Sequence, residues 1–359
     1  MNNSPFSKLK IVEIASVLAG PSVGLFFAEL GAEVIKIENK RTNGDVTRSW
    51  RLPAEDKARS ISAYFSSVNG YKTSIFMDFT NADDDQKLRQ LIAEADILIV
   101  NFKKGDAEKF KLDYLTLKAS NPALIYGEIT GFGADSDRVA YDLILQAESG
   151  FMSMNGTPES GPVKMPVALI DLLAGHQLKT GVLTALYQRD VEQKQGAKVS
   201  VSLYDAALAS LANQATNWLM EGHIPQRIGS THPNIAPYGE LFETKDKRTI
   251  TFAIGSNKQF GHLCKFIGTE ELINHPQFKD NGTRVKNRVS LASYLQDAVS
   301  KFNAEELLPE LEARFVPVAQ IKNLEEVFEN EAAQNLVITE EIEGVTTKKV
   351  ATAVFTINR

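Results

Sequence analysis

Cysteine and histidine are scarce in this chain of 359 residues. A single cysteine, Cys264, excludes an internal disulfide, and the five histidines form neither an HExxH motif nor a paired Cys/His spacing. These are the patterns by which zinc and other transition-metal sites are usually found in a sequence. We therefore expect a protein that uses no metal.

Long apolar runs are also missing. The longest uncharged runs, Ile14–Ala28 and Ala206–Met220, have 15 residues each, whereas a membrane-spanning helix needs about 17–25. The amino terminus, MNNSPFSKLK, lacks the apolar core of a signal peptide. The sequence therefore predicts a cytoplasmic protein without membrane contact.

An excess of basic charge is absent as well. The formal net charge is -6, so a nucleic-acid partner would need a local basic face that the overall balance does not suggest. Hydrophobic residues make up 43% and charged residues 23% of the chain, which is typical of a soluble globular protein. At this length we expect two domains with sizeable cores and no nucleic-acid role.

Short β-branched runs alternate with helical patterns in the first half of the chain. The expected strands are KIVEIA, EVIKIE, DILIV and ALIYGEI, and the helical patterns between them include Gly20–Leu30 and Gln86–Ala95. This βαβ rhythm is typical of a parallel sheet covered by helices. The fold class predicted for this half is therefore α/β.

The second half changes in composition. Helical patterns at Leu172–Arg189 and Tyr204–Glu221 flank the strand-like KVSVSL, and the text from Gly222 to Gly239 is dense in Gly, Pro and His, as in a linker. The predicted organisation is a large α/β domain over residues 1–220, a linker and a smaller α+β domain over 221–324, and a tail over 325–359 that returns to the large domain.

The stretch GPSVG at Gly20–Gly24 matches the G-x-S-x-G nucleophile elbow of α/β-hydrolases. It follows the first expected strand, however, whereas the elbow normally comes after several strands. Gly20 as a turn and Pro21 at the start of a helix explain it more simply. A serine hydrolase acting through Ser22 is therefore kept as the less favoured alternative.

Basic residues follow several of the expected strands. Loops at the carboxyl ends of parallel strands are where α/β proteins bind ligands, so these cations either cradle phosphates or form a solvated rim. The set consists of Lys36, Lys40, Arg41, Arg48, Lys72, Lys103 and Lys104.

Asp171 stands in the stretch MPVALIDLLAGHQLKTG, between apolar residues and the start of a helical pattern. As a helix N-cap, its carboxylate would accept bonds from the N–H groups of Leu173 or Ala174. The same helix end would keep the carboxylate ionised, which is the form that attacks an activated acyl group. The residue pattern leaves both interpretations open.

Many stretches in order resemble one family, the class III CoA-transferases, which includes formyl-CoA:oxalate and carnitine CoA-transferases and α-methylacyl-CoA racemase. The resemblance covers nearly the whole chain. The matching stretches are LKIVEIASVLAGPSVGLFFAELGAEVIKIE, GDVTR, NGYKTSI, NFKKGDAEKFKLDY, NPALIYGEITGFG, YDLILQAESG, DLLAG, HPNIAPYG and AIGSNKQF.

The resemblance implies a Rossmann-like large domain, an interlocked homodimer and CoA transfer between an acyl-CoA and a carboxylic acid acceptor. Asp171 matches the aspartate that attacks the acyl-CoA carbonyl to give a mixed anhydride and then an aspartyl-CoA thioester. Coenzyme A enters as the acyl-CoA substrate, and neither ATP nor a metal is needed.

The resemblance also implies a set of binding residues. Those expected at CoA are Val17, Leu18, Ala19, Asn39, Lys40, Arg41, Lys72, Asn101, Phe102, Lys109 and Phe110. Those expected at the substrate are Tyr141 and Asp142, at the mouth of the active site.

Two positions depart from relatives with other activities. Formyl-CoA transferases have glutamine at Leu18, which argues against an oxalate-type acceptor. The racemase branch needs a histidine before the residue that matches Asp142, and this chain has Tyr141 there, a poor base near neutral pH. We therefore favour a transferase over a racemase. A CoA-binding paralogue in which Asp171 only caps its helix is a further alternative.

Overall fold

The structure, a computed structural model, describes residues 4–191 and 195–358. Its internal contacts divide the chain into two units, each with a hydrophobic core of its own. Unit 1 consists of Met1–Ser153, Lys164–Pro225 and Asn335–Arg359, and unit 2 of Met154–Val163 and Gln226–Gln334.

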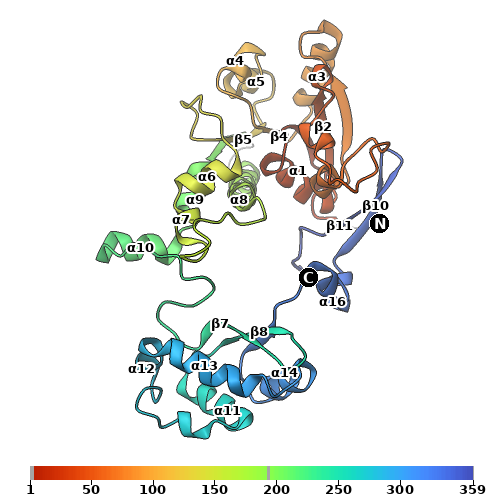
Figure 1. Cartoon of the computed structure of the whole chain (residues 1–359). Coiled ribbons are helices and arrows are strands. Elements are labelled where there is room, and N and C mark those ends of the chain that lie inside the picture. The colour runs from red at the N-terminus through yellow and green to blue at the C-terminus, as the bar shows by residue number, and fades with distance from the viewer. Residues whose placement is uncertain (1–3, 192–194, 359) are drawn as a thin grey trace. The chain divides into compact units, whose positions relative to one another are not determined.

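Unit 1 is built on a six-stranded sheet in which every pairing is parallel (Figure 1). The strands are β1 (Lys10–Ile14), β2 (Glu33–Asn39), β3 (Thr73–Met77), β4 (Ile97–Val100), β5 (Ile125–Thr130) and β6 (Lys198–Ser202). Their order is β3-β2-β1-β4-β5-β6, so the direction of winding reverses between β1 and β4. The predicted parallel α/β fold is confirmed, and its ligand crevice is expected at this switch point.

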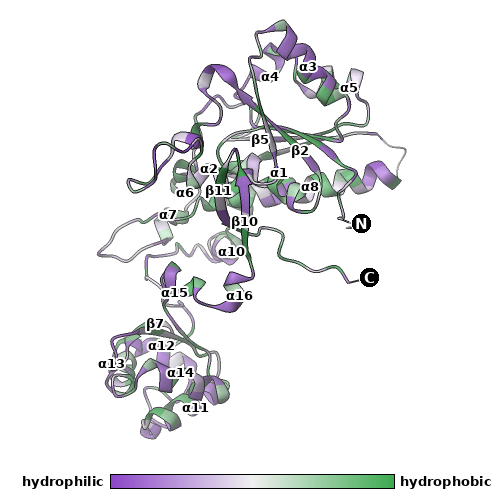
Figure 2. Cartoon of the chain, turned by 90° about the vertical axis from the view of Figure 1, so that its right-hand side faces the viewer, coloured by the Kyte–Doolittle hydropathy of each residue, from purple (hydrophilic) through white to green (hydrophobic). Residues whose placement is uncertain are grey.

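Helices cover both faces of this sheet because successive strand residues point to opposite sides. Ile11 packs with helices α1 (Ala19–Glu29) and α8 (Leu169–Val191), whereas its neighbour Val12 packs with α3 (Ala82–Ala93) and α5 (Tyr114–Ser120). Helix α3, whose first turn contains three successive aspartates, is mainly hydrophilic in Figure 2. The sheet is therefore the middle layer of three.

Shorter elements complete the helical part of unit 1. They are η1 (Lys40–Thr42), η2 (Val46–Ser49), α2 (Ala63–Asn69), α4 (Asp106–Lys109), α6 (Asp142–Glu148), α7 (Phe151–Met154, at the unit boundary), α9 (Leu203–Ala209) and α10 (Ala212–Glu221). The single helix predicted over Tyr204–Glu221 is wrong. Ala212 has φ 47°, outside the right-handed helical range, so one helix ends at Ala209 and another follows.

Unit 2 packs helices on an antiparallel sheet of β7 (Tyr238–Glu243), β8 (Thr249–Ala253) and β9 (Val318–Gln320). Its core includes Phe252, Phe260 and Leu295, which are all nearly inaccessible. The helices are α11 (Asn257–Ile267), η3 (Glu270–Leu272), α12 (Asn281–Lys286), α13 (Arg288–Val299), α14 (Ala304–Ala313), α15 (Leu324–Phe328) and α16 (Glu331–Gln334).

The carboxyl-terminal segment belongs to unit 1 and forms a hairpin of β10 (Val337–Ile342) and β11 (Val345–Val350). Ile342 packs against Phe65 of α2, and Glu343 accepts two hydrogen bonds from Arg48. The hairpin is therefore attached to unit 1 by both apolar and charged contacts. Among the described helices, none is long and apolar enough to cross a membrane.

Candidate active site

The loop that follows β1 lies at the switch point of the sheet. The amide side chain of Asn101, directly after β4, donates to the carbonyl of Ser16 at 2.9 Å and accepts from its N–H at 3.2 Å. The carboxyl ends of β1 and β4 are thus joined, and Val17–Ala19 and Asn101–Phe102 come together at the edge where doubly wound sheets bind ligands.

Helix α1 begins directly after this loop and packs on α8 through small residues. A methyl group on Gly175 of α8 would collide with Ser22 Oγ and lie 3.2 Å from the carbonyl oxygen of Ala19. Only glycine allows this approach of the two helices. The first turn of α1 is therefore held against α8 about one turn from Asp171.

Ser22 does not stand on a nucleophile elbow. Helix α1 begins at Ala19, so Gly20, expected to form the turn, is already helical and Ser22 lies inside the first turn. Its side chain is buried, and its hydroxyl donates to the carbonyl of Ala19 at 2.8 Å. The structure therefore places this hydroxyl in helix packing and not in an exposed turn.

Asp171 is the third residue of α8, because the helix begins at Leu169 and not at Leu172. The N-cap geometry expected for it is wrong: Leu169 and Ile170 are already helical. The residue is only 7% exposed. Within the described part of the chain its carboxylate has no hydrogen-bond or ion-pair partner in the protein, and its oxygens keep slight contact with solvent.

Burial raises the pKa of Asp171 to about 7, and the nearby charge of Asp142 adds to this effect. Burial likewise raises the pKa of the Tyr64 hydroxyl to about 12, with further contributions from Asp171, Asp142 and Asp45. Loss of water disfavours each charged form, and neighbouring carboxylates disfavour a second negative charge. The surroundings of Asp171 are thus negative and poorly hydrated.

Asp142 connects the starts of two helices. It is the first residue of α6, and its Oδ1 accepts the N–H of Ile170 at 2.7 Å, while Oδ2 accepts from the amide of Gln146 at 2.6 Å. Gln146 in turn accepts the N–H of Met165 at 2.8 Å. Asp142 therefore fixes the first turn of α8, in which Asp171 lies.

Comparison with known proteins identifies the family. The model of CoA-transferase family III matches residues 6–358. The chain belongs to CoA-transferase family III. Among curated relatives, the succinate–glutarate CoA-transferase of Agrobacterium fabrum is 36% identical over 92% of this chain and 83% of its own length. The human succinyl-CoA:glutarate CoA-transferase is 32% identical over 98% of this chain and 80% of its own length.

Solved structures agree with this family. A CAIB/BAIF family protein from Brucella suis is 36% identical, with a TM-score of 0.87 over 99% of this chain and 93% of its own. An aspartate-to-alanine mutant of Rv3272 from Mycobacterium tuberculosis is 26% identical, with a TM-score of 0.83 over the same shares of both chains. This chain is thus an enzyme of the CoA-transferase class with an α/β fold.

Three of the seven cations considered for phosphate binding in this CoA-transferase are internal. Lys36 Nζ lies 3.1 Å from both Glu13 and Asp45, and Arg48 lies 2.7 Å from both Glu38 and Glu343. The side chain of Lys72 is fully buried, donates to Glu13 at 2.8 Å and to the carbonyl of Pro21 at 2.8 Å.

These contacts rule against phosphate binding by Lys36, Arg48 and Lys72. Burial lowers the pKa of Lys72 to about 8 against the attraction of Glu13, and the ammonium is enclosed by protein oxygens. The predicted contact of Lys72 with CoA is therefore not the contact that the structure gives it. The reason is long-range: Glu13 lies on β1 and approaches Lys72 only in the folded sheet.

The other residues expected at CoA lie nearer to solvent. Lys40, Arg41, Lys103, Lys104 and Lys109 are exposed. They follow β2 and β4, at the same sheet edge as the loop after β1. Arg41 lies 3.5 Å from Asp78, and Lys104 donates to the carbonyl of Asp135 at 2.6 Å, so these two cations already have protein partners.

The uncharged residues expected at CoA have structural partners. Asn39 accepts the N–H of Arg41 at 2.9 Å and caps η1. Phe102 and Phe110 are half-buried against the core below β4, and Phe110 stacks edge-on against Phe79. Tyr141, which was expected at the substrate, precedes α6 and is 56% exposed.

Two residues near the site were not assigned a role from the sequence. Tyr64 is placed on α2 by Ser62, whose hydroxyl caps the helix and donates to the carbonyl of Thr47 at 2.6 Å. Asp45 accepts the N–H of Val17. The only sequence signal for Asp45 was its place in GDVTR, a stretch that matched the family without a stated function.

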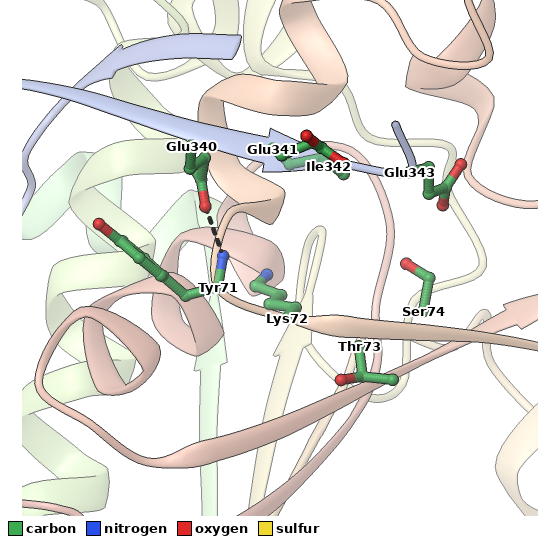
Figure 3. Close-up of a pocket in the computed structure, with 8 residues that line it drawn as sticks. All are labelled: Tyr71, Lys72, Thr73, Ser74, Glu340, Glu341, Ile342 and Glu343. Carbon is green, nitrogen blue, oxygen red and sulfur yellow. Dashed lines mark hydrogen bonds between the residues drawn. The ribbon is translucent and has the colours of Figure 1, made fainter. Parts of the chain in front are cut away.

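A separate hollow of about 460 Å³ lies between β3 and the carboxyl-terminal hairpin, and Figure 3 shows its walls. Its lining residues are Tyr71, Lys72, Thr73, Ser74, Glu340, Glu341, Ile342 and Glu343. Asp171 is not among them. Glu340 is bonded to Lys349 and Glu343 to Arg48, whereas Glu341, also in the lining, is exposed. Within residues 4–191 and 195–358 there is no cluster of three or more His, Cys, Asp or Glu suited to a metal.

Proposed function

We propose that Asp171 is the covalent nucleophile of a CoA transfer between two carboxylic acids. The observation that carries this proposal is a buried carboxylate that has no partner among the residues the structure describes, in the first turn of α8 and beside the switch point of the sheet. Buried carboxylates in proteins are normally paired or hydrogen-bonded, and uncompensated ones are frequently functional.

The reaction conserves one activated acyl bond throughout. The Asp171 carboxylate attacks the thioester carbonyl, forms a mixed anhydride and releases CoA thiolate. The thiolate then attacks the aspartyl carbonyl, which frees the donor acid and leaves an aspartyl-CoA thioester. The acceptor carboxylate repeats these steps in reverse, so that acyl-CoA of the acceptor and free Asp171 result. No ATP is consumed.

The surroundings of Asp171 suit both halves of this cycle. Burial removes water that would hydrolyse an anhydride. The amino end of α8 offers backbone N–H groups and a partial positive charge, which favour the carboxylate and the oxyanions of acyl transfer. This effect opposes the burial that raises the pKa of Asp171, so the group is poised to ionise near neutral pH.

We propose further that CoA lies along the edge formed by the ends of β1, β2 and β4. Val17–Ala19 would lie at the thioester, Asn101 and Phe102 beside the pantetheine and adenine, and exposed cations at the phosphates. Tyr141 and Asp142 would border the acceptor. Two domains that correspond to units 1 and 2, and an interlocked homodimer, are part of the same proposal.

The relatives' names support small dicarboxylates as the acids. They name succinate, glutarate, oxalate and mesaconate as substrates of those proteins. We propose succinyl-CoA as donor and glutarate as acceptor for this chain. Leu18 in place of glutamine argues for an acceptor other than oxalate.

The test is transfer from succinyl-CoA to glutarate by the full chain and two variants. Asp171→Ala is expected to lose at least about 10³-fold in kcat, since no other group supplies the covalent step. Asp205→Ala is the matched control, because Asp205 is the third residue of α9 but is exposed. Activity of Asp171→Ala near wild type, or equal loss in both variants, would overturn the proposal.

A further inference from the structure

Three side chains from separate segments hold the backbone of the loop after β1. Lys36 Nζ donates to the carbonyl of Ala15 at 2.7 Å. Asn101 bonds both polar groups of Ser16, as described above. The N–H of Val17 points at the carboxylate of Asp45, 3.3 Å from Oδ1 and 3.2 Å from Oδ2. Consecutive backbone groups of this loop are thus fixed by the fold.

Val17 needs such a restraint. Its φ is 72°, in the left-handed region that a β-branched residue rarely adopts, because its Cβ crowds the backbone there. Strained residues of this kind persist only where surrounding contacts determine them, and they gather at functional sites. Without its acceptor, Val17 would be expected to relax to negative φ.

Asp45 is itself rigidly placed. Its side chain is almost inaccessible, lies 3.1 Å from Lys36 Nζ and accepts from the hydroxyl of Thr47 at 2.8 Å. Its N–H donates to Glu38 Oε2 at 2.8 Å. Gly44, before it, has φ 89°, and a methyl group there would collide with Glu38. The stretch GDVTR therefore builds a fixed acceptor for Val17.

The loop ends where α1 begins, and the first turn of α1 lies against α8. Ala19 and Ser22 contact Gly175, four residues after Asp171 on the same helix. A change of φ at Val17 would rotate the backbone that enters α1 and displace this contact. The conformation of Val17 is therefore coupled through packed helices to the position of Asp171.

We propose that Asp45 is a positioning residue of the transfer reaction: it holds Val17 in the left-handed conformation and so sets the first turn of α1 relative to Asp171. The proposal rests on the proposed function of Asp171. It gives GDVTR a role that composition and motif matching did not reveal, and it makes Asp45 important without contact with the reacting atoms.

The test compares Asp45→Ala with the double variant Asp45→Ala/Val17→Gly. Loss of the acceptor is expected to lower kcat roughly 10–100-fold, the size of effect that a displacement of about 1 Å causes at a reacting centre. Glycine adopts positive φ without strain, so the double variant is expected to recover at least several-fold of that loss. A merely structural role of Asp45 predicts instead that Val17→Gly adds a loss of its own.

A matched control exists at the hollow of Figure 3. Tyr71 has φ 58°, and its N–H donates to Glu340 Oε2 at 2.9 Å, the same pairing of a carboxylate with a left-handed residue. Glu340→Ala is expected to lower the unfolding midpoint while kcat per folded protein stays within about twofold of wild type. A loss of kcat in Glu340→Ala as large as in Asp45→Ala would overturn the positioning role.

Crystal structures of the same variants separate this proposal from the proposed function. In Asp45→Ala, Val17 is expected at negative φ, and in the double variant residue 17 is expected back at positive φ. These results would support the restraint even if the wild type showed no transfer, which would instead refute the role of Asp171. Val17 unchanged at positive φ in Asp45→Ala, or no recovery of kcat in the double variant, would overturn the inference.

Discussion

Unit 1 contains two groups of buried carboxylates with opposite surroundings. Glu13, Asp45 and Glu38 lie next to Lys36, Lys72 or Arg48, with every oxygen-to-nitrogen distance near 3 Å. Asp171 is also buried, and among the described residues the charge that acts on its pKa is that of another carboxylate, Asp142. The paired acids hold the loops in place, whereas the unpaired acid is left with a raised pKa and free oxygens. Among the described residues of this unit, the buried carboxylates that form ion pairs have structural roles, and the one without a cationic partner is the candidate for catalysis.

The largest change expected from breaking the paired group comes from Lys36→Met. It leaves Asp45 without its buried counter-charge and removes the bond to Ala15, so we expect the free energy of unfolding to fall by about 3–5 kcal/mol. Urea unfolding at pH 7.5 measures it. The control is Lys10→Met, which breaks the exposed pair of Lys10 with Glu94 and is expected to change stability little. Equal effects of the two variants would contradict the comparison.

The unpaired acid is expected to behave in the opposite way. Because the folded-state pKa of Asp171 is raised to about 7 from 3.8, the native state binds a proton more tightly than the unfolded state. The stability that this tighter proton binding contributes is fully present below about pH 4 and is lost as the pH rises to about 7. Asp171→Asn should therefore raise the free energy of unfolding at pH 8 by roughly 1–3 kcal/mol.

Thermal unfolding of the wild type and Asp171→Asn at pH 5 and pH 8 checks this sign. We expect the difference in stability between Asp171→Asn and the wild type to be larger at pH 8 than at pH 5. A variant less stable than wild type at pH 8 would mean that the Asp171 carboxylate is stabilised by the fold, as the paired acids are. The expected gain in stability with loss of activity is the usual exchange at an active site.

The pH dependence of transfer sharpens the same contrast. Below about pH 7 Asp171 is mostly protonated and cannot attack, so kcat/KM is expected to rise with pH and level off above it. Asp142→Asn removes the second cause of the raised pKa and should shift the midpoint to lower pH. A profile that is flat from pH 5 to 8, with the thioester's stability controlled, would argue against an ionising Asp171.

The smallest effect is expected at Ser22. Its hydroxyl donates to the carbonyl of Ala19 inside helix α1, so Ser22→Ala should cost no more than about 1 kcal/mol of stability. Transfer activity should stay within a few-fold of wild type. Loss of activity comparable with that of Asp171→Ala would restore the serine hydrolase alternative.

The sequence predicted the strands well because runs such as DILIV and ALIYGEI are rich in apolar and β-branched residues, as buried parallel strands are. It did not predict what Lys36, Lys72 and Arg48 do. Their partners Glu13 and Glu343 come from distant parts of the chain, and a local pattern gives no access to such pairing. The cations therefore resembled a ligand rim in the sequence and are ion pairs in the fold.

Asp171 was likewise predicted only in part. Its importance was accessible from the sequence through the resemblance, but its place in the helix was not, because Leu169 and Ile170 lack the polar character of a helix start. The left-handed conformation of Val17 was equally hidden, since a β-branched residue predicts the opposite. The backbone strain at Val17 and the burial of Asp171 were not predicted, because both depend on tertiary contacts.

The central claim is that Asp171 becomes covalently modified during transfer. The most direct measurement is mass spectrometry of the protein after incubation with succinyl-CoA, followed by mapping of any CoA adduct to the peptide that contains Asp171. We predict an adduct there in the wild type and none in Asp171→Ala, with CoA binding retained in both. Transfer to glutarate without an adduct on this peptide, or an adduct that persists in Asp171→Ala, would contradict the account.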